Sequence, residues 1–244
     1  TLYRNIFDHI SSVAGRYSGK IKGWDVVNEA ILDDGSYREN DFYKISADEY
    51  IFKSFEIAHK IDPNAELYYN DFSMYKPEKC DAAIRIANKI LERGLRIDGI
   101  GLQAHWGLDY PSIDEIETSI LKIHEAGFRV HFTELDIDVL PNLWEIEGAD
   151  LSDNFKSNDQ LNPYKSSLPD SISDLLSDRY SEIFELFDKH NDKIDRVTFW
   201  GLSDGHSWKN DWPAKGRTNY PLLFDRENNP KKAYKDIMML FNEK

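Results

Sequence analysis

The chain is organised around the stretch His131–Asp138, which reads HFTELDID. With Val130 it forms a β-branched and aromatic run that predicts a β-strand. Side chains on a strand alternate between two faces, so Glu134 and Asp136 point one way and Leu135 the other. Two neighbouring acids on a mostly buried strand cost desolvation and repulsion unless other groups compensate. The pair indicates either a functional site or, more simply, an exposed strand end with two solvated acids.

The composition is that of a globular protein with a sizeable core. Its 244 residues are 41% hydrophobic and 13% aromatic, which argues against disorder. A net charge of −14 opposes binding to nucleic acid and to anionic membranes. No apolar run is long enough for insertion into a membrane. The single cysteine, Cys80, excludes an internal disulfide and a cysteine metal site.

Predicted helices and strands alternate along the chain. Apolar periodicity, caps and breakers predict five strands: Lys20–Asn28, Glu66–Asn70, Gly99–His105, Phe128–Asp136 and Ile194–Trp200. The same signals predict six helices, the second capped by Ser46: Leu2–Ala14, Ala47–Lys60, Pro77–Arg93, Ile113–Ala126, Ser171–His190 and Lys231–Phe241. The polar stretch Leu140–Asp170 is too long for a simple connection, which indicates function or disorder. Strands that alternate with helices are typical of parallel β-α units.

The residues that end the predicted strands favour a barrel over an open sheet. Every strand finishes in polar or aromatic chemistry: Asn28-Glu29, Asn70-Asp71, Gln103-Ala104-His105, Glu134-Leu135-Asp136 and Trp200. In an eight-stranded β/α barrel the C-terminal ends of all strands face one active site. A doubly wound sheet would concentrate its site at one switch point. Five such endings in series therefore predict a barrel.

Two glutamates at these strand ends indicate glycoside hydrolysis, which requires one protonated and one ionised carboxyl group. Glu29 alone would be interpreted as a surface acid, and its catalytic interpretation depends on pairing with Glu134. His105 is most simply a strand-end histidine with satisfied hydrogen bonds. It is also placed to bind a carboxylate of a neighbouring strand, with Asp136 behind it, and so to stabilise the charge of Glu134.

Motifs for other chemistries fail on position or spacing. Gly99–Ala104 fits a loose dinucleotide pattern but lies within a strand and opens no helix. His124-Glu125 begins like a zinc protease motif, but Phe128 occupies the position of the second histidine. The sequence contains no nucleophile elbow and no Walker loop. We therefore expect neither a metal site nor a cofactor.

Six motifs in order across almost the whole chain resemble glycoside hydrolase family 10, the endo-1,4-β-xylanases. They are WDVVNEA, YYNDF, GLQAHW, FTELDID, TFWGLSDGHSW and PLLFD. The tail SWKNDWPAKGRTNYPLLFDR is similar to xylanases of gut Bacteroidetes. The resemblance implies a (β/α)8 TIM barrel. It also implies hydrolysis of internal β-1,4-xylosidic bonds of xylan by double displacement, with retention of configuration.

The resemblance also implies roles for single residues. Glu29 would be the general acid/base and Glu134 the nucleophile, which His105 and Asp136 would hold. Substrate would be bound by the remaining strand-end side chains: Asn28 at the sugar 2-hydroxyl, Asn70, Gln103, Trp200 and Trp208. As bare sequence, Trp200 and Trp208 are equally packing residues, and Trp212 is a weaker candidate of the same kind. Retention predicts carboxyl groups about 5–5.5 Å apart. We also expect the pKa of the acid Glu29 to be raised toward about 6, as in other glycosidases.

The resemblance covers only part of the family's barrel. The opening helix precedes the family's fourth strand, so residues 1–244 would form a partial catalytic domain with roughly strands 4–8. The expected partners are xylan, xylo-oligosaccharides and an N-terminal barrel segment of the same protein, or a domain swap from another copy. We expect a secreted, periplasmic or cell-surface bacterial protein, although no signal is visible. Two alternatives stay open: a catalytically incomplete xylan-binding fragment and, more weakly, a related retaining enzyme for cellulose or mannan.

Overall fold

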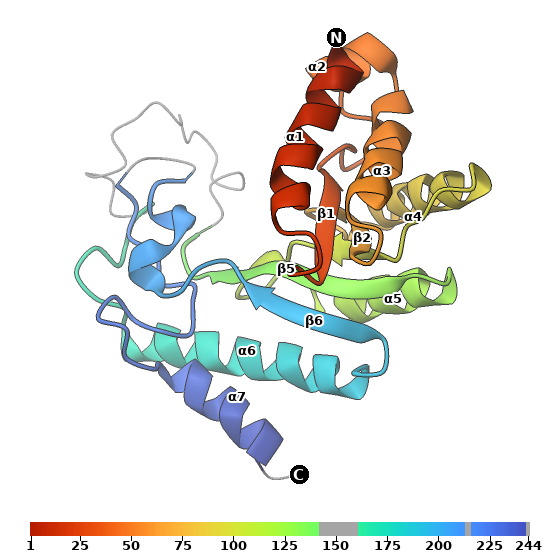
Figure 1. Cartoon of the computed structure of the whole chain (residues 1–244). Coiled ribbons are helices and arrows are strands. Elements are labelled where there is room, and N and C mark those ends of the chain that lie inside the picture. Colours follow the sequence, from red (N-terminus) through yellow and green to blue (C-terminus); the bar gives the residue numbers. More distant parts are fainter. Residues whose placement is uncertain (142–160, 213–215, 243–244) are drawn as a thin grey trace. The chain divides into compact units, whose positions relative to one another are not determined.

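The computed structural model describes residues 1–141, 161–212 and 216–242 (Figure 1). The chain divides into two compact units. Unit 1 consists of Thr1–Ala104, Glu115–Thr133 and Asp192–Val197, and unit 2 of His105–Asp114, Glu134–Asn191 and Thr198–Lys244. The boundary passes through the strand that ends with the HFTELDID stretch, so this strand contributes residues to both units.

Unit 1 is built on a parallel sheet. The strands β1 (Gly23–Asn28), β2 (Glu66–Asp71), β3 (Gly99–Leu102) and the first half of β5 (Arg129–Asp138) pair in that order. The start of β6 (Ile194–Phe199) follows β5, where the Val130 N–H donates to the Lys193 carbonyl. In this register Asn28 lies opposite Asn70 at the ends of β1 and β2, so their side chains are close enough to interact.

Four helices and most of a fifth belong to unit 1: α1 (Leu2–Arg16), α2 (Asp41–Ser46), α3 (Glu49–Ile61), α4 (Pro77–Glu92) and α5 (Ile113–Glu125). Local chemistry sets their ends. The Asn40 side chain accepts from the Tyr43 N–H at the start of α2, and Pro77 opens α4, where its missing N–H costs nothing. Helices α1 and α3 lie side by side (Figure 1).

The core of unit 1 lies between β2 and its helices. Leu67, Tyr68 and Tyr69 are fully buried in β2. Helix α4 is amphipathic and buries the residues of one face, Cys80 among them. Cys80 is 1% exposed, and burial raises the pKa of its thiol to about 11. Gly99 is required by close packing, because a Cβ atom there would lie 2.5 Å from the Arg129 carbonyl oxygen.

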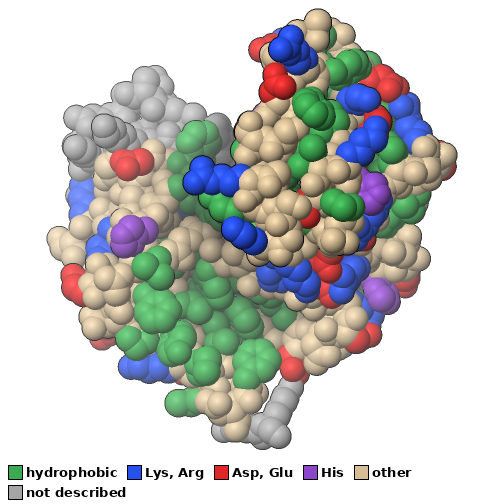
Figure 2. Space-filling model, in the orientation of Figure 1, with side chains coloured by type: hydrophobic (Ala, Val, Ile, Leu, Met, Phe, Trp, Pro, Cys, Tyr) green, Lys and Arg blue, Asp and Glu red, His purple; other side chains and the backbone are tan. Residues whose placement is uncertain are grey.

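Unit 2 contains the short strand β4 (His105–Gly107), which pairs in parallel with the second half of β5, His105 opposite Asp136. Helices α6 (Asp170–Lys189) and α7 (Lys232–Asn242) pack against each other (Figure 1). Tyr180 of α6 is fully buried, and its hydroxyl donates to the Pro221 carbonyl at 2.6 Å. Figure 2 shows hydrophobic side chains gathered over α6 and α7, where exposed apolar residues include Leu175, Met238, Met239 and Phe241.

Most predicted elements are confirmed within a few residues, and the departures have local causes. The single strand predicted at Gly99–His105 is wrong, because Ala104 takes a positive φ of 64° and divides it into β3 and β4. The predicted N-cap Ser46 is also wrong. It ends the short, unpredicted helix α2, and α3 starts after Asp48. Of the polar stretch Leu140–Asp170, residues 142–160 lie outside the described part of the chain.

Within the residues that the structure describes, no helix has both the length and the apolar composition needed to cross a membrane.

Candidate active site

Glu29 lies in unit 1, directly after β1, and its backbone has an unusual conformation. Its φ is +57°, in the left-handed region that a residue with a Cβ atom rarely occupies. The Glu29 N–H donates to the Asn70 carbonyl at 3.0 Å, which continues the pairing of β1 with β2. The Nε2 group of Gln103 donates to Glu29 Oε1 at 2.9 Å, and the Asn28 amide approaches the same oxygen at 3.4 Å. The carboxyl group therefore has amide donors on one oxygen.

Amide side chains around Glu29 form one ordered hydrogen-bond chain. The Thr133 hydroxyl donates to Asn70 Oδ1 at 2.7 Å, and the Asn70 amide nitrogen donates to Asn28 Oδ1 at 3.0 Å. Gln103 donates to that same Asn28 oxygen at 3.1 Å. Asn70 and Gln103 are 2% and 3% exposed, so these bonds fix which end of each amide faces which partner. The structure thus brings together the predicted residues Asn28, Glu29, Asn70 and Gln103.

A glycine makes room for this chain. A Cβ atom at position 101 would lie 2.5 Å from Asn70 Oδ1 and 2.9 Å from the Thr133 methyl carbon. Gly101 therefore lets the Asn70 side chain lie across β3.

The second group of predicted residues lies in unit 2, around His105. Its Nδ1 atom is 2.9 Å from Asp136 Oδ1 and its Nε2 atom is 3.2 Å from Glu134 Oε2. The register of β4 against β5 places His105 opposite Asp136. Asp136 is fully buried, and the indole N–H of Trp208 donates to its other oxygen at 2.9 Å. Asp136 thus orients both the imidazole and the indole.

The electrostatics of this group favour a charged imidazole. Burial opposes the imidazolium form, but the hydrogen bonds to Asp136 and Glu134 outweigh it, so the pKa of His105 is raised above 6.5. A protonated His105 can donate to a carboxylate oxygen of Asp136 and of Glu134 at the same time. The contacts that the sequence predicted for His105 are thus present, whereas its role in supporting a nucleophile stays a prediction.

Lys209 completes the group and was not predicted. Its ammonium lies 3.5 Å from Asp136 Oδ1 and 3.6 Å from Asp138 Oδ2, and the residue is only 7% exposed. It also lies 4.9 Å from the centre of the Trp208 ring. The one signal in the sequence was its position after Trp208. A loop lysine is normally solvated, so nothing in the pattern indicated its burial.

The three candidate tryptophans of unit 2 are all partly open to solvent. Trp200, Trp208 and Trp212 are 46%, 37% and 53% exposed, and the rings of Trp208 and Trp212 are 5.9 Å apart. The Trp200 N–H donates to the Leu135 carbonyl at 3.1 Å, so Trp200 lies directly beside β5. Exposed indole faces are suited to stacking on sugar rings.

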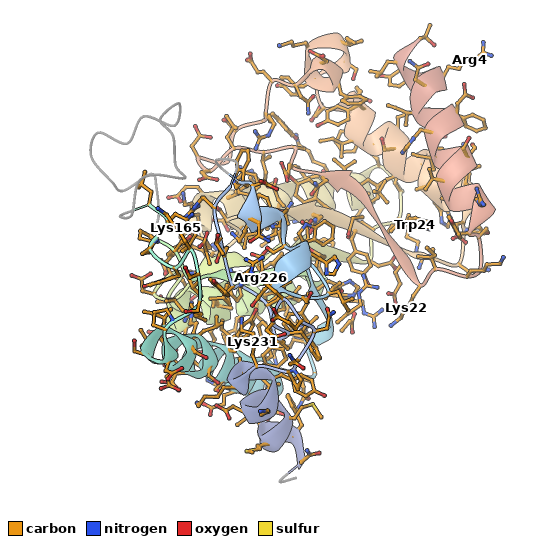
Figure 3. All side chains as sticks on the ribbon, turned by 90° about the vertical axis from the view of Figure 1, so that its left-hand side faces the viewer. Arg4, Lys22, Trp24, Lys165, Arg226 and Lys231 are labelled. Atoms are coloured by element: carbon orange, nitrogen blue, oxygen red, sulfur yellow. The ribbon has the colours of Figure 1, made fainter. Side chains whose placement is uncertain are left out.

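A buried ion pair anchors the loop that carries these tryptophans. Asp204 is fully buried, and Lys231 binds it at 3.0 Å. Lys231 also donates to the Tyr220 carbonyl, and Arg226 donates to Asn219 and Asn210. Figure 3 shows Arg226 and Lys231 in this segment before α7. Hydrogen bonds and an ion pair among residues of this segment therefore hold the loop in place.

Within the described residues, no group of three or more histidine, cysteine or acidic side chains is arranged to hold a metal ion. The candidate residues form two carboxyl-centred groups, one in each unit: Asn28, Glu29, Asn70 and Gln103 in unit 1, and His105, Glu134, Asp136, Trp200 and Trp208 in unit 2. Both carry their carboxyl at or near the C-terminal end of a parallel strand, where α/β barrels place catalytic residues.

Comparison with known proteins gives a consistent result. The pattern of glycosyl hydrolase family 10 matches residues 1–240. Endo-1,4-beta-xylanase A of Xylanibacter ruminicola is 46% identical over 98% of this chain and 65% of its own length. An endo-1,4-beta-xylanase of Geobacillus stearothermophilus is 37% identical over 96% of this chain and 66% of its own.

The solved structures agree. A GH10 endoxylanase from a sugarcane soil metagenome superimposes with a TM-score of 0.90 at 44% identity, over 98% of this chain and 68% of that one. The chain thus spans about two thirds of the length of the relatives it matches. With an α/β architecture, a parallel sheet and a match over residues 1–240, the chain belongs to glycosyl hydrolase family 10, a family of (β/α)8 barrels.

Proposed function

We propose that this chain is the larger part of a retaining endo-1,4-β-xylanase that cleaves internal β-1,4-xylosidic bonds of xylan. One observation carries the proposal. Each of the two glutamates has a neutral or cationic hydrogen-bond donor on its carboxyl group, Gln103 on Glu29 and His105 on Glu134. The relatives named as xylanases support xylan as the substrate.

In the first chemical step, the ionised Glu134 attacks the anomeric carbon of the xylose unit at the cleavage point. Glu29, as a carboxylic acid, gives its proton to the glycosidic oxygen, and the bond between that oxygen and the anomeric carbon breaks. The products are a glycosyl ester on Glu134, a released xylan end and an ionised Glu29. His105, whose pKa is raised, donates to Glu134 and holds the carboxylate in position before attack.

In the second step, water replaces the ester. Glu29 accepts a proton from the water while the oxygen of that water attacks the anomeric carbon. The ester bond breaks, which frees Glu134 as a carboxylate. Two inversions at one carbon give net retention. Asn28, fixed by Asn70 and Gln103, would bind the 2-hydroxyl of the reacting sugar, and Trp200 and Trp208 would stack on sugar rings.

The rest of the barrel is proposed to come from an N-terminal segment of the same protein that supplies the family's first three strands. The length of the relatives supports this, as does an apolar groove of about 300 Å³ beside β1. Ile6, Ile10, Val26, Phe42 and Tyr50 are among the residues that line it. A strand added at this edge would cover the groove and extend the parallel sheet. Secretion or surface attachment follows from a polymeric substrate that cannot enter a cell.

The alternative, a xylan-binding fragment without activity, is supported by the same difference in length. A reducing-sugar assay on xylan, with the chain alone and with the upstream segment added, separates the two. Activity in either arm supports the xylanase, whereas binding of xylan without turnover in both arms supports the fragment. Parallel assays on cellulose and mannan test the remaining substrates.

The residue roles are tested by substitution. Glu134→Ala should abolish turnover and leave xylan binding intact, while Glu92→Ala, an exposed residue at the end of α4, should change neither. Proton NMR of the first products should show the β-anomer. Turnover by Glu134→Ala, or initial release of the α-anomer, would contradict the mechanism.

A further inference from the structure

The conformation of Glu29 is costly, and an arrangement in unit 1 maintains it. Non-glycine residues at positive φ are uncommon and persist where their surroundings determine them. Both peptide groups that flank Glu29 are held by hydrogen bonds. Its N–H donates to the Asn70 carbonyl, and its carbonyl accepts from Arg38 Nε at 2.9 Å. The carboxyl group can meet Gln103 only while these peptide groups keep their orientation.

The amide that follows Glu29 has an unusual acceptor. The N–H of Ala30 donates to the hydroxyl oxygen of Tyr69, at 3.1 Å. Ala30 and Tyr69 are both fully buried, so water cannot replace this bond. A backbone N–H at this point would normally pair with another backbone group. The Tyr69 hydroxyl therefore fixes the orientation of the peptide group between Glu29 and Ala30.

The hydroxyl is itself oriented by a buried ionic chain. It donates to Asp71 Oδ2 at 2.5 Å, so its lone pair is turned toward the Ala30 N–H. The other oxygen of Asp71 accepts from the Lys79 ammonium at 3.0 Å, and both side chains are 0% exposed. Lys79 also contacts Asp33 at 3.2 Å and lies 3.4 Å from the centre of the Phe72 ring. Two buried charges of opposite sign thus fix the direction of one neutral hydroxyl.

We propose that Tyr69, oriented by Asp71 and Lys79, is a positioning residue that holds Glu29 in the conformation needed for proton transfer. The inference rests on the proposed role of Glu29 as general acid/base. Without the Tyr69 hydroxyl, the Ala30 amide loses its acceptor and Glu29 relaxes toward ordinary backbone angles, which moves its carboxyl group away from Gln103. Proton donation by Glu29 to the leaving oxygen becomes slower, whereas the attack by Glu134 is unaffected.

The test uses Tyr69→Phe, which removes a single oxygen atom. Tyr68→Phe is the matched control, because Tyr68 is the neighbouring residue of β2, is equally buried, and donates its hydroxyl to Glu66 outside this chain of contacts. Both variants are assayed in whichever form of the protein hydrolyses xylan. The substrates are aryl xylobiosides with a poor leaving group, phenol, or a good one, 2,4-dinitrophenol. The good leaving group departs without protonation and needs no acid.

For Tyr69→Phe we expect kcat/KM on the phenyl substrate to fall about 10- to 100-fold, the range for a misplaced acid. On the dinitrophenyl substrate the first step should change less than about threefold, measured as the burst of dinitrophenol. Tyr68→Phe should show no dependence on the leaving group. Equal losses of Tyr69→Phe on both substrates would overturn the proposal, because they would indicate a general structural defect.

Two further measurements keep the outcomes separate. Amide hydrogen exchange at Ala30 should become faster in Tyr69→Phe but not in Tyr68→Phe, and this readout needs no activity. Glu29→Ala tests the underlying role. If Glu29→Ala shows no dependence on the leaving group, the proposed function fails. If it shows the dependence and Tyr69→Phe does not, the positioning role alone fails. Should Tyr69→Phe not fold, Asp71→Asn, which keeps the shape of the side chain, should give the same pattern to a smaller degree.

Discussion

His131 at the start of the HFTELDID stretch should make unit 1 sensitive to acid. The side chain is 1% exposed, and its ring stacks on that of Tyr68 with centroids 3.9 Å apart. Arg196 Nη2 lies 3.4 Å from its Nδ1 atom. Burial, and then the charge of Arg196, lower the pKa of His131 from 6.5 to about 4, although Asp195 and Glu66 act in the opposite direction.

The sign and size of the effect follow from these two values. Below pH 6.5 the unfolded chain binds a proton at His131, and the folded chain does not do so until about pH 4. Acid therefore favours unfolding, and the stability present above pH 6.5 is lost as the pH falls toward 4. Between pH 7.5 and pH 5.0 the loss from this residue amounts to about 2 kcal/mol of unfolding free energy.

The assay compares the parent chain with His131→Phe, which keeps a ring stacked on Tyr68 but cannot titrate. Urea unfolding followed by far-UV circular dichroism at pH 7.5 and 5.0 gives the two free energies. The variant should lose about 2 kcal/mol less than the parent over this interval. A similar replacement at the exposed His9 is the control for removing a histidine. Equal losses in parent and His131→Phe, or a His131 ring found protonated by NMR at pH 5.5, would refute the reasoning.

Three other substitutions test the described contacts. Lys79→Met leaves the fully buried carboxylate of Asp71 without a cation and should lower the unfolding free energy by about 3–5 kcal/mol. Lys76→Met, at a half-exposed pair, should cost at most about 1 kcal/mol in the same urea titration. Lys209→Met should raise the pKa of His105 further, because the ammonium opposes the imidazolium; an unchanged or lower value in a histidine NMR titration would contradict this. Gly99→Ala places a methyl group against backbone and should destabilise the chain by about 1–3 kcal/mol in thermal melts.

Much of the fold was predictable because its signals are local. The periodicity of α4 and α6, with Pro77 at one helix start and Gly94 beyond one helix end, decided those elements. The break between β3 and β4 was not predictable, since Ala104 has no intrinsic preference for positive φ and adopts it only in the folded sheet. The six-residue helix α2 was missed because so short a segment has almost no periodicity.

In each unit the predicted site residues form a hydrogen-bonded group, because the ends of neighbouring parallel strands carry most of them. What the sequence could not indicate were contacts set by packing. Thr133 orients Asn70, and Lys209 reaches Asp136 from the short 3-10 helix Trp208–Asn210. Tyr69 was part of a quoted motif, but alternation along a strand does not disclose that its hydroxyl meets the Ala30 amide.

The lone cysteine gives the protein a built-in reporter. Cys80 is the only thiol in the sequence, it lies on the buried face of α4, and its raised pKa keeps it unreactive at neutral pH. A thiol reagent can therefore label it only when the packing of α4 opens. The labelling rate would measure how often unit 1 opens locally in the unmodified protein, without an added dye or an introduced residue. Tryptophan fluorescence reports mainly on unit 2, where Trp106, Trp200, Trp208 and Trp212 lie, so the two signals together would time the opening of each unit separately.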